Sequence, residues 1–181
     1  MVNRSVGALF AGALSALLAT PAAASTQGTF GATSTGSVTI NASVPGRVRI
    51  SGLSDVTFAN ADPSVAASNA QNVCVWSNTS TQGYRLTATG SGASNAFTLA
   101  NAALTVPYTV EWSGSSGQTS GTGLLAGTAL TGQTSGAINS DCSAGPSSSA
   151  SLVVSVASPD LQGMTAGVTY NGTLTLVVAP E

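Results

Sequence analysis

One stretch of the sequence decides the fold class, Leu104-Thr-Val-Pro-Tyr-Thr-Val-Glu-Trp112, because apolar and polar residues alternate along its whole length. Successive side chains of a β-strand point to opposite faces, so this pattern predicts a strand with one buried face. Pro107 has no N–H to donate, which predicts an edge position or a bulge within this strand. The side chains predicted to be buried are Leu104, Val106, Tyr108, Val110 and Trp112.

The same alternation recurs on both sides of this stretch. One further strand is predicted from Gly83 to Gly90, and its hairpin partner from Asn72 to Trp76. Beyond the first 24 residues, no segment carries the apolar stripe of a helix. Short strands separated by Gly- and Ser-rich connections predict an all-β sandwich. The remaining predicted strands are Arg47 to Ile50, Asp55 to Phe58, Ala96 to Leu99, Ala150 to Val156 and Val168 to Val178, and typical connections are Ser113 to Gly123 and Thr131 to Gly136.

The first 24 residues have the pattern of a signal peptide. Arg4 precedes a Leu- and Ala-rich run that ends before Pro21, and small residues follow. Cleavage is predicted between Ala24 and Ser25, which would release an exported chain. The apolar run is shorter than the roughly 20 residues that a membrane-spanning helix needs. We therefore expect export without stable membrane insertion.

A second apolar-faced strand is predicted directly after the leader. Residues 25–44 form an N-terminal extension that ends in Gly36-Ser-Val-Thr-Ile-Asn-Ala-Ser-Val44. Such a strand either pairs within its own domain or reaches into another subunit, and the sequence leaves both open. Residues 45–181 are expected to form a single domain. The side chains on the shared apolar face of the extension are Val38, Ile40, Ala42 and Val44.

The composition argues against most kinds of chemistry. Only 6% of the residues are charged, and the chain contains no histidine and no lysine. Without histidine, Ser-His-Asp and Cys-His catalytic arrangements are impossible, and two distant cysteines lack the spacing of a metal site. A chain without clustered Lys and Arg cannot neutralise a row of phosphates. We therefore expect no enzyme activity, no cofactor, no metal and no nucleic-acid partner.

Two further groups of residues have alternative interpretations. Cys74 and Cys142 are predicted to form a disulfide in an oxidising compartment, the alternative being two free thiols. The aromatic residues form either a sugar-binding platform or part of the core, and their phase on the predicted strands favours the core. These aromatic residues are Trp76, Tyr84, Tyr108, Trp112 and Tyr170.

Three stretches together resemble a known family. The first is Val73-Cys-Val-Trp-Ser-Asn78 with Tyr84-Arg-Leu-Thr-Ala-Thr-Gly90, and the second is Val106-Pro-Tyr-Thr-Val-Glu-Trp112. The third is the C-terminal stretch Ala166-Gly-Val-Thr-Tyr-Asn-Gly-Thr-Leu-Thr-Leu-Val-Val-Ala-Pro-Glu181. In this order they are similar to the bacterial chaperone-usher pilins of the archaic, or sigma, class, which share the spore coat protein U domain.

The resemblance implies an immunoglobulin-like β-sandwich that lacks its final strand and is completed by a donor strand. A periplasmic chaperone would fill the open groove first, an outer-membrane usher would export the subunit, and a neighbouring pilus subunit would then supply its N-terminal strand. The implied function is that of a fimbrial subunit at the cell surface that supports adhesion or biofilm formation. Val38, Ile40, Ala42 and Val44 would be the donor anchors.

One departure from the family leaves the place in a fibre open. Family members often carry a cysteine near the start of the first domain strand, where this chain reads Pro45-Gly-Arg-Val-Arg-Ile50. The chain would then be either a major rod subunit or a minor one near the tip. Two alternatives to a fimbrial subunit are a secreted carbohydrate-binding or adhesin module, and a spore or cell coat protein assembled without an usher.

Overall fold

The computed structural model describes residues 25–181, so the predicted signal peptide, including Ala24 of the cleavage site, lies outside the described residues. The described residues divide into two units, which meet between Val44 and Pro45. All of the named strands belong to the second unit.

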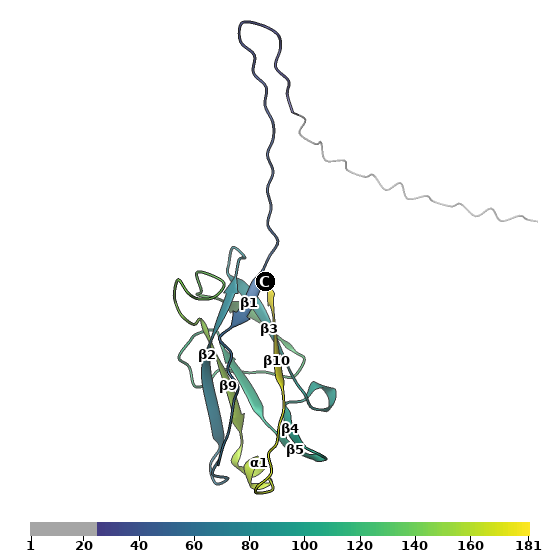
Figure 1. Ribbon diagram of the computed structural model, residues 1–181, viewed down its shortest axis with the longest axis vertical. Helices are drawn as coiled ribbons and strands as arrows, with labels where there is room; N and C mark the ends of the chain where they lie inside the picture. The colour runs from purple at the N-terminus through teal and green to yellow at the C-terminus, as the bar shows by residue number, and fades with distance from the viewer. Residues whose placement is uncertain (1–24) are drawn as a thin grey trace, which may run out of the picture. The chain divides into compact units, whose positions relative to one another are not determined.

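The second unit consists almost entirely of antiparallel β-strands (Figure 1). One sheet has five strands in the spatial order β1-β2-β9-β6-β7, and a second has three in the order β10-β3-β8. The strands of the five-stranded sheet are β1 (Val48–Ser51), β2 (Ala67–Ser77), β9 (Ala150–Val156), β6 (Thr109–Ser113) and β7 (Thr122–Gly123). Those of the three-stranded sheet are β10 (Leu174–Pro180), β3 (Gly83–Gly90) and β8 (Ala129–Thr134).

Three smaller elements complete the described unit. Strands β4 (Thr98–Asn101) and β5 (Leu104–Pro107) pair with each other as a two-stranded sheet. A 3-10 turn, η1 (Ala93–Asn95), precedes β4, and one short helix, α1 (Ser158–Gln162), follows β9. The prediction of an all-β sandwich is confirmed, although the sequence pattern did not reveal α1.

The core lies between the five-stranded and three-stranded sheets. Val75 of β2 and Leu86 of β3 are fully buried in one apolar cluster with Trp112 of β6. Trp112 packs edge-on against Tyr84, with ring centroids 6.5 Å apart, and its indole N–H donates to the Tyr84 hydroxyl at 3.1 Å. This pair satisfies two polar groups inside the core, as buried tyrosine and tryptophan require.

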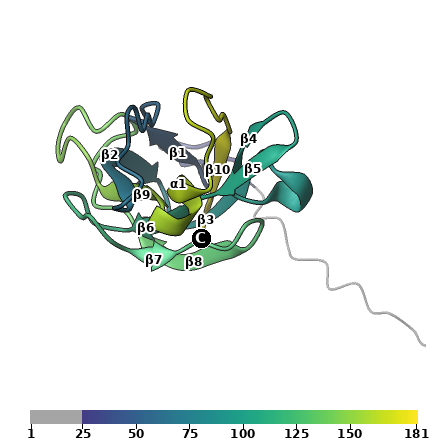
Figure 2. The same ribbon diagram turned by 90° about the horizontal axis from the view of Figure 1, so that it is seen from below.

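One seam between the two large sheets is closed by the chain itself. Residues 122–130 leave β7 of the first sheet and enter β8 of the second, and these two strands lie together in the end view (Figure 2). Leu124 donates its N–H to the Val110 carbonyl at 2.8 Å, and Gly127 donates to the Ala88 carbonyl at 2.8 Å. Leu124 is only 8% exposed. We call this crossing the closed seam.

The opposite seam lies between β1 and β10, which are the outermost strands of their respective sheets. β1 is hydrogen-bonded to β2 and β10 to β3, and no ladder joins β1 to β10 among residues 45–181. After β1, Gly52 has a φ of +79°, a conformation that glycine adopts without strain, and the ladder to β2 ends there. We call the gap between β10 and β1 with residues 52–61 the open seam.

The observed strands agree with the predicted ones in part. β3 and β9 have the predicted limits, Gly83–Gly90 and Ala150–Val156. The predicted strand over Leu104 to Trp112 is instead two strands, because Pro107 ends β5 and β6 begins at Thr109 in another sheet. Leu104 was predicted to be buried and is exposed at the end of the β4–β5 hairpin, so that prediction was wrong.

Three other expectations about strands were also wrong. The predicted hairpin partner, Asn72 to Trp76, lies in β2 and does not pair with β3, because β2 pairs with β1 and β9 in one sheet and β3 pairs with β10 and β8 in the other. No strand covers Asp55 to Phe58, because this segment has no ladder with β2 beyond the turn at Gly52. β8 lies partly in the predicted connection Thr131 to Gly136, where glycine and polar residues hide the strand pattern.

The disulfide joins Cys74 of β2 to Cys142 in the connection between β8 and β9. The two sulfurs are buried with Ala137, and Trp76 packs half-buried against them. Ser149 adds a second tie, since its hydroxyl accepts from the Val75 N–H and donates to the Val75 carbonyl, both at 2.8 Å. The long β8–β9 connection is thereby held against β2.

Candidate functional site

A large groove lined by both apolar and polar residues occupies the open seam. Its volume is about 1120 Å³, which exceeds the range of roughly 300–1,000 Å³ typical of small-molecule sites. The floor comes from β9 and from Tyr108 between β5 and β6, and the walls come from residues 53–61 and from β10. The main apolar residues of the lining are Val56, Phe58, Leu99, Leu152, Val154, Val156, Leu161, Met164, Leu174 and Leu176.

β10 forms one wall of the groove and offers a free strand edge. It pairs with β3 from Leu174 opposite Gly90 to Pro180 opposite Tyr84, and its other side has no strand partner within the described residues. Leu174 and Leu176 line the groove and are only half-buried. An unpaired row of backbone N–H and C=O groups is a template for another strand.

The opposite wall, residues 53–61, is held in place by side chains. Ser54 donates its N–H to the Gln71 side-chain oxygen at 2.7 Å, and the Gln71 amide donates to the Ser54 carbonyl at 3.0 Å. Further along, the Ser158 hydroxyl donates to the Pro63 carbonyl at 2.8 Å. These contacts position the wall while leaving its main chain outside any strand ladder.

The far end of the groove is bounded by the connection between α1 and β10. Asn171 and Ala100 of β4 exchange two backbone hydrogen bonds, of 2.9 and 2.8 Å. The Asn101 amide donates to the Thr169 carbonyl at 2.9 Å, and the Thr165 N–H donates to the Tyr170 hydroxyl at 3.2 Å. This end is thus built from ordered main chain.

The groove offers few groups for chemistry. Asp55 is the one carboxylate among its lining residues, which contain no basic side chain. The Tyr108 side chain is 7% exposed, and its hydroxyl has no hydrogen-bond partner in the described part of the chain. Burial raises the pKa of Tyr108 above its ordinary value of 10.0, so the hydroxyl stays protonated at neutral pH. The arrangement is suited to binding apolar side chains.

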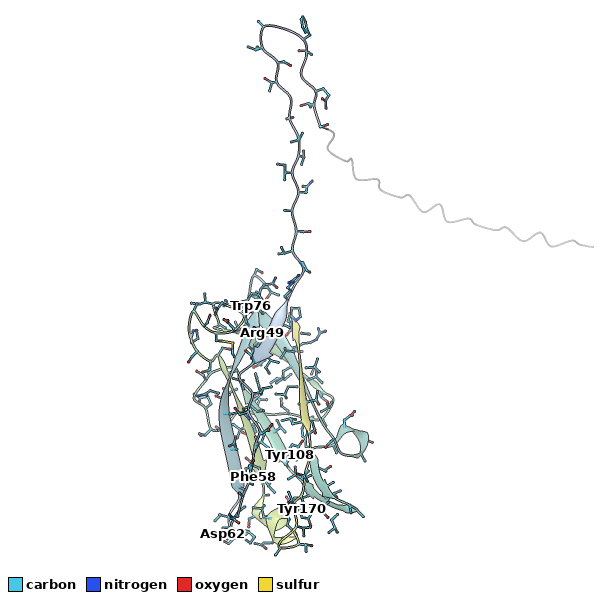
Figure 3. The ribbon with its side chains drawn as sticks, in the orientation of Figure 1. Arg49, Phe58, Asp62, Trp76, Tyr108 and Tyr170 are labelled. Atoms are coloured by element: carbon cyan, nitrogen blue, oxygen red, sulfur yellow. A yellow bond between two sulfur atoms is a disulfide. The ribbon has the colours of Figure 1, made fainter. Side chains whose placement is uncertain are left out.

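Figure 3 shows Phe58, Tyr108 and Tyr170 in the same half of the domain, away from Trp76. Tyr108 and Tyr170 line the groove, whereas Tyr84 and Trp112 lie in the closed core. Trp76 lies half-buried beside the disulfide. The five aromatic residues therefore do not form one exposed platform.

Sequence reasoning missed several groove residues. Leu161 and Met164 lie in or next to α1, where no strand alternation marks them, and Phe58 lies in a wall without a ladder. The half-buried state of Leu174 and Leu176 was also hidden, because alternation reports a shared face and not whether that face is covered.

In the N-terminal segment, residues 25–44, the apolar side chains are exposed, whereas the main apolar residues of the groove lining are buried or half-buried. Val38, Ile40 and Val44 are 74%, 87% and 83% exposed, and Ala42 is exposed as well. Residues 38–44 are not part of any strand. Residues 25–37 form a loop, which is closed by an isolated β-bridge between Thr26 and Ser37. Thr26 and Ser37 exchange backbone hydrogen bonds of 2.9 and 3.0 Å, and their hydroxyls are 2.6 Å apart.

Residues 25–181 contain neither a candidate metal site nor a candidate membrane-spanning helix. No group of three or more acidic, cysteine or histidine side chains is placed to hold a metal ion in this part of the chain. No helix among the described residues has the length and hydropathy to cross a membrane.

Comparison with known proteins supports the architecture. No protein-family model matches the chain, and no curated protein sequence matches it. A similar solved structure is described as "Chaperone-tip adhesin complex is vital for synergistic activation of CFA/I fimbriae biogenesis". The TM-score is 0.50 at 14% sequence identity, over 75% of this chain and 41% of that one. The chain spans about two fifths of the length of that protein, and likeness at this identity concerns the fold alone.

Proposed function

We propose that this protein is a structural subunit of a bacterial surface fimbria of the chaperone-usher type, assembled by donor-strand exchange. In this proposal the groove of one copy accepts residues 38–44 of another copy. The observation that carries it is the open seam itself, a groove bordered by the free edge of β10. A strand added there would satisfy the backbone groups of β10 and cover its half-buried leucines.

The proposed donor fits the chemistry of the groove. Val38, Ile40, Ala42 and Val44 recur at every second position, which is the spacing of side chains on one face of a strand. Full burial of a Val or Ile side chain stabilises a complex by about 1.5–3 kcal/mol. Three such side chains leave water when the donor enters, while Thr39, Asn41 and Ser43 keep contact with solvent.

The remaining parts of the proposal concern the route to the surface. Residues 1–24 would act as a signal peptide cleaved between Ala24 and Ser25, residues 25–44 as the donor extension, and residues 45–181 as the acceptor domain. A periplasmic chaperone would cover the groove before assembly, since an open groove with a free strand edge favours aggregation. An outer-membrane usher would then bring subunits together, and the resulting fibre would support adhesion or biofilm formation.

Deletion of Gly36 to Val44 tests the proposed function. The deleted chain keeps every strand of the domain, so we expect a monomer that accepts a donor strand and cannot supply one. Added to the exported wild-type chain, it should shorten the polymers, as measured by size-exclusion chromatography with light scattering. Ser43→Ala is the matched control, because it changes an outward-facing position and should leave assembly intact. If the exported wild-type chain stayed monomeric at all concentrations, that result would contradict the proposal.

A further inference from the structure

The junction between the N-terminal extension and the domain is held by the side chain of Asn78. Its side-chain oxygen accepts a hydrogen bond from the Arg47 N–H at 2.5 Å, and its amide donates to the Pro45 carbonyl at 3.0 Å. The Asn78 N–H also donates to the Arg47 carbonyl at 3.0 Å, one position beyond the ladder that pairs Val48 with Ser77. Residues 45–47 therefore continue the line of β1 beside the end of β2.

A donor segment that is attached to an acceptor domain has two possible destinations. β1 begins four residues after Val44 and is an outermost strand at the open seam. A reversal of the chain between them would therefore lay residues 38–44 along the seam of their own copy. A segment on a short tether reaches such a site at an effective concentration on the order of millimolar. Assembly between copies needs a feature that keeps the segment out of its own groove.

The alternation of the segment restricts how the chain can reverse. Val48 of β1 packs against the core, and residues opposite each other on paired strands share a face. A two-residue turn at residues 45–46 would place Ser43 opposite Val48 and so turn the polar face of the segment inward. A three-residue turn at residues 45–47 would place Val44 opposite Val48. Of these two shortest turns, only the three-residue turn would bury the apolar face.

The three-residue turn makes two demands on Arg47. Its common form is a type I turn followed by a residue in the left-handed conformation, which is strained for any residue with a side chain like that of Arg47. The type I turn is closed by a hydrogen bond from the Arg47 N–H to the Val44 carbonyl. In the structure that N–H is donated to the Asn78 side chain. Reversal would also part Gly46 from Pro180 of β10, since a Cβ at Gly46 would lie only 3.4 Å from the Pro180 ring.

We propose that Asn78 directs the donor segment to another copy, because its hydrogen bonds to Pro45 and Arg47 stop the chain from reversing into its own groove. This inference rests on the proposed function, in which residues 38–44 occupy the groove of a neighbour. Asn78 does not line the groove, so it acts through the junction as a positioning residue. Arg47 adds to the effect, because it resists the left-handed conformation that the turn needs.

The test compares variants of the exported chain. The double variant Asn78→Ala with Arg47→Gly frees the N–H and admits the left-handed conformation, so residues 38–44 should enter their own groove. The matched control, Asn78→Ala with Arg47→Ala, loses the same hydrogen bonds and the same charge but keeps a side chain at position 47. Hydrogen–deuterium exchange is measured on dilute monomer, and size-exclusion chromatography with light scattering follows assembly at higher concentration.

The glycine variant should differ from the wild-type chain in three ways. Amides of residues 38–44 should exchange roughly tenfold more slowly in its monomer, its polymers should be largely lost, and its thermal midpoint should be higher because the groove is covered. The alanine control should show roughly fivefold less protection than the glycine variant, which is the size of the preference of glycine for the left-handed conformation. Equal protection in the two variants would overturn the part assigned to Arg47.

Asn78→Asp is the conservative variant. Its carboxylate can still accept from the Arg47 N–H, so this chain should assemble like the wild type and leave residues 38–44 unprotected in the monomer. A merely structural role for Asn78 predicts a different pattern. Both alanine-containing variants would then have a lower thermal midpoint, and residues 38–44 would stay unprotected in their monomers, which would overturn the inference.

A peptide separates failure of this inference from failure of the proposed function. A synthetic peptide of residues 36–45 should bind the chain that lacks Gly36 to Val44. If the peptide binds and the glycine variant still polymerises with residues 38–44 unprotected in its monomer, the inference is overturned and donor-strand exchange stands. If the peptide does not bind, the proposed function fails, and the role of Asn78 fails with it.

Discussion

Outermost β-strands border both seams of the sandwich, but the chain itself covers only one of the two seams. At the closed seam, residues 122–130 cross from β7 to β8, and Leu124 fills the gap. At the open seam, β1 and β10 remain outermost strands, and a groove of about 1120 Å³ lies between β10 and residues 53–61. The domain therefore covers one side of its core with its own chain and leaves the other side open, where we propose that a donor strand adds. Changes at the closed seam should affect folding, and changes at the open seam should affect assembly.

The largest effect is expected from Ile40→Asp. A carboxylate buried in the groove without a partner should cost about 4 kcal/mol or more, roughly a thousandfold in donor binding. Polymers should disappear in light scattering, and the thermal midpoint of the monomer should not change. The control Ile40→Val removes one methylene and should cost only about 1 kcal/mol. Polymers of normal length with Ile40→Asp would show that the open seam does not accept this segment.

Removal of the disulfide should destabilise the domain to the same extent whether the groove at the open seam is empty or occupied. Cys74 and Cys142 are 68 residues apart, and in the chain-entropy model a loop of that length contributes about 4 kcal/mol to stability. The double variant Cys74→Ala and Cys142→Ala should show this loss in urea unfolding. The loss should be similar with and without a donor peptide, a synthetic peptide of residues 36–45. A loss that vanishes when the peptide is bound would mean that the β8–β9 connection takes part in the groove.

Leu124→Ala tests the closed seam. Truncation of this buried leucine should lower the free energy of unfolding by about 3 kcal/mol, because it removes apolar contact and leaves a cavity. Donor peptide should bind the surviving folded fraction with unchanged affinity. A weakened affinity measured by calorimetry would mean that the two seams are coupled.

Leu176→Ala is the matched variant at the open seam. In the free chain Leu176 is half-buried, so its truncation should cost only about 1 kcal/mol of unfolding free energy. The cost should rise to about 3 kcal/mol once a donor strand covers it. Equal costs in the two states, from urea titrations with and without peptide, would contradict the assignment of Leu176 to a covered groove.

The smallest expected effect is on the stability of the domain at alkaline pH. Burial raises the pKa of Tyr108 in the folded chain above its unfolded value, so the associated stability is complete below about pH 10. It is lost as the pH rises through the folded pKa, because the phenolate is better solvated in the unfolded chain. Tyr108→Phe should remove this part of the alkaline loss of stability, as measured by urea unfolding at increasing pH. An identical pH profile for the variant would show that Tyr108 is solvated in the groove.

The alternation of residues predicts much of the core and little of the open seam. Gly83 to Gly90 and Ala150 to Val156 are continuous strands buried on at least one face, so period two identifies them. The stretch Leu104 to Trp112 is equally regular, yet its two halves join different sheets at Pro107. Local pattern reports which side chains share a face, and the choice of partner strand depends on the whole topology.

The groove depends on features that leave little trace in the sequence. Residues 53–61 are placed by the Gln71 side chain, and the end wall by backbone bonds between Ala100 and Asn171. Leu161 enters the lining from a short helix. The apolar face of residues 38–44 was visible in the sequence, and its exposure was not.

Hydrogen–deuterium exchange of the exported chain, before and after assembly, tests the account most directly. Amides of residues 38–44 and the free edge of β10 should exchange rapidly in the isolated chain. Both should become protected together in the polymer, and mixtures of labelled and unlabelled copies should show that the protecting strand comes from another molecule. Protection of residues 38–44 in the isolated monomer, or rapid exchange of those residues in the polymer, would contradict it.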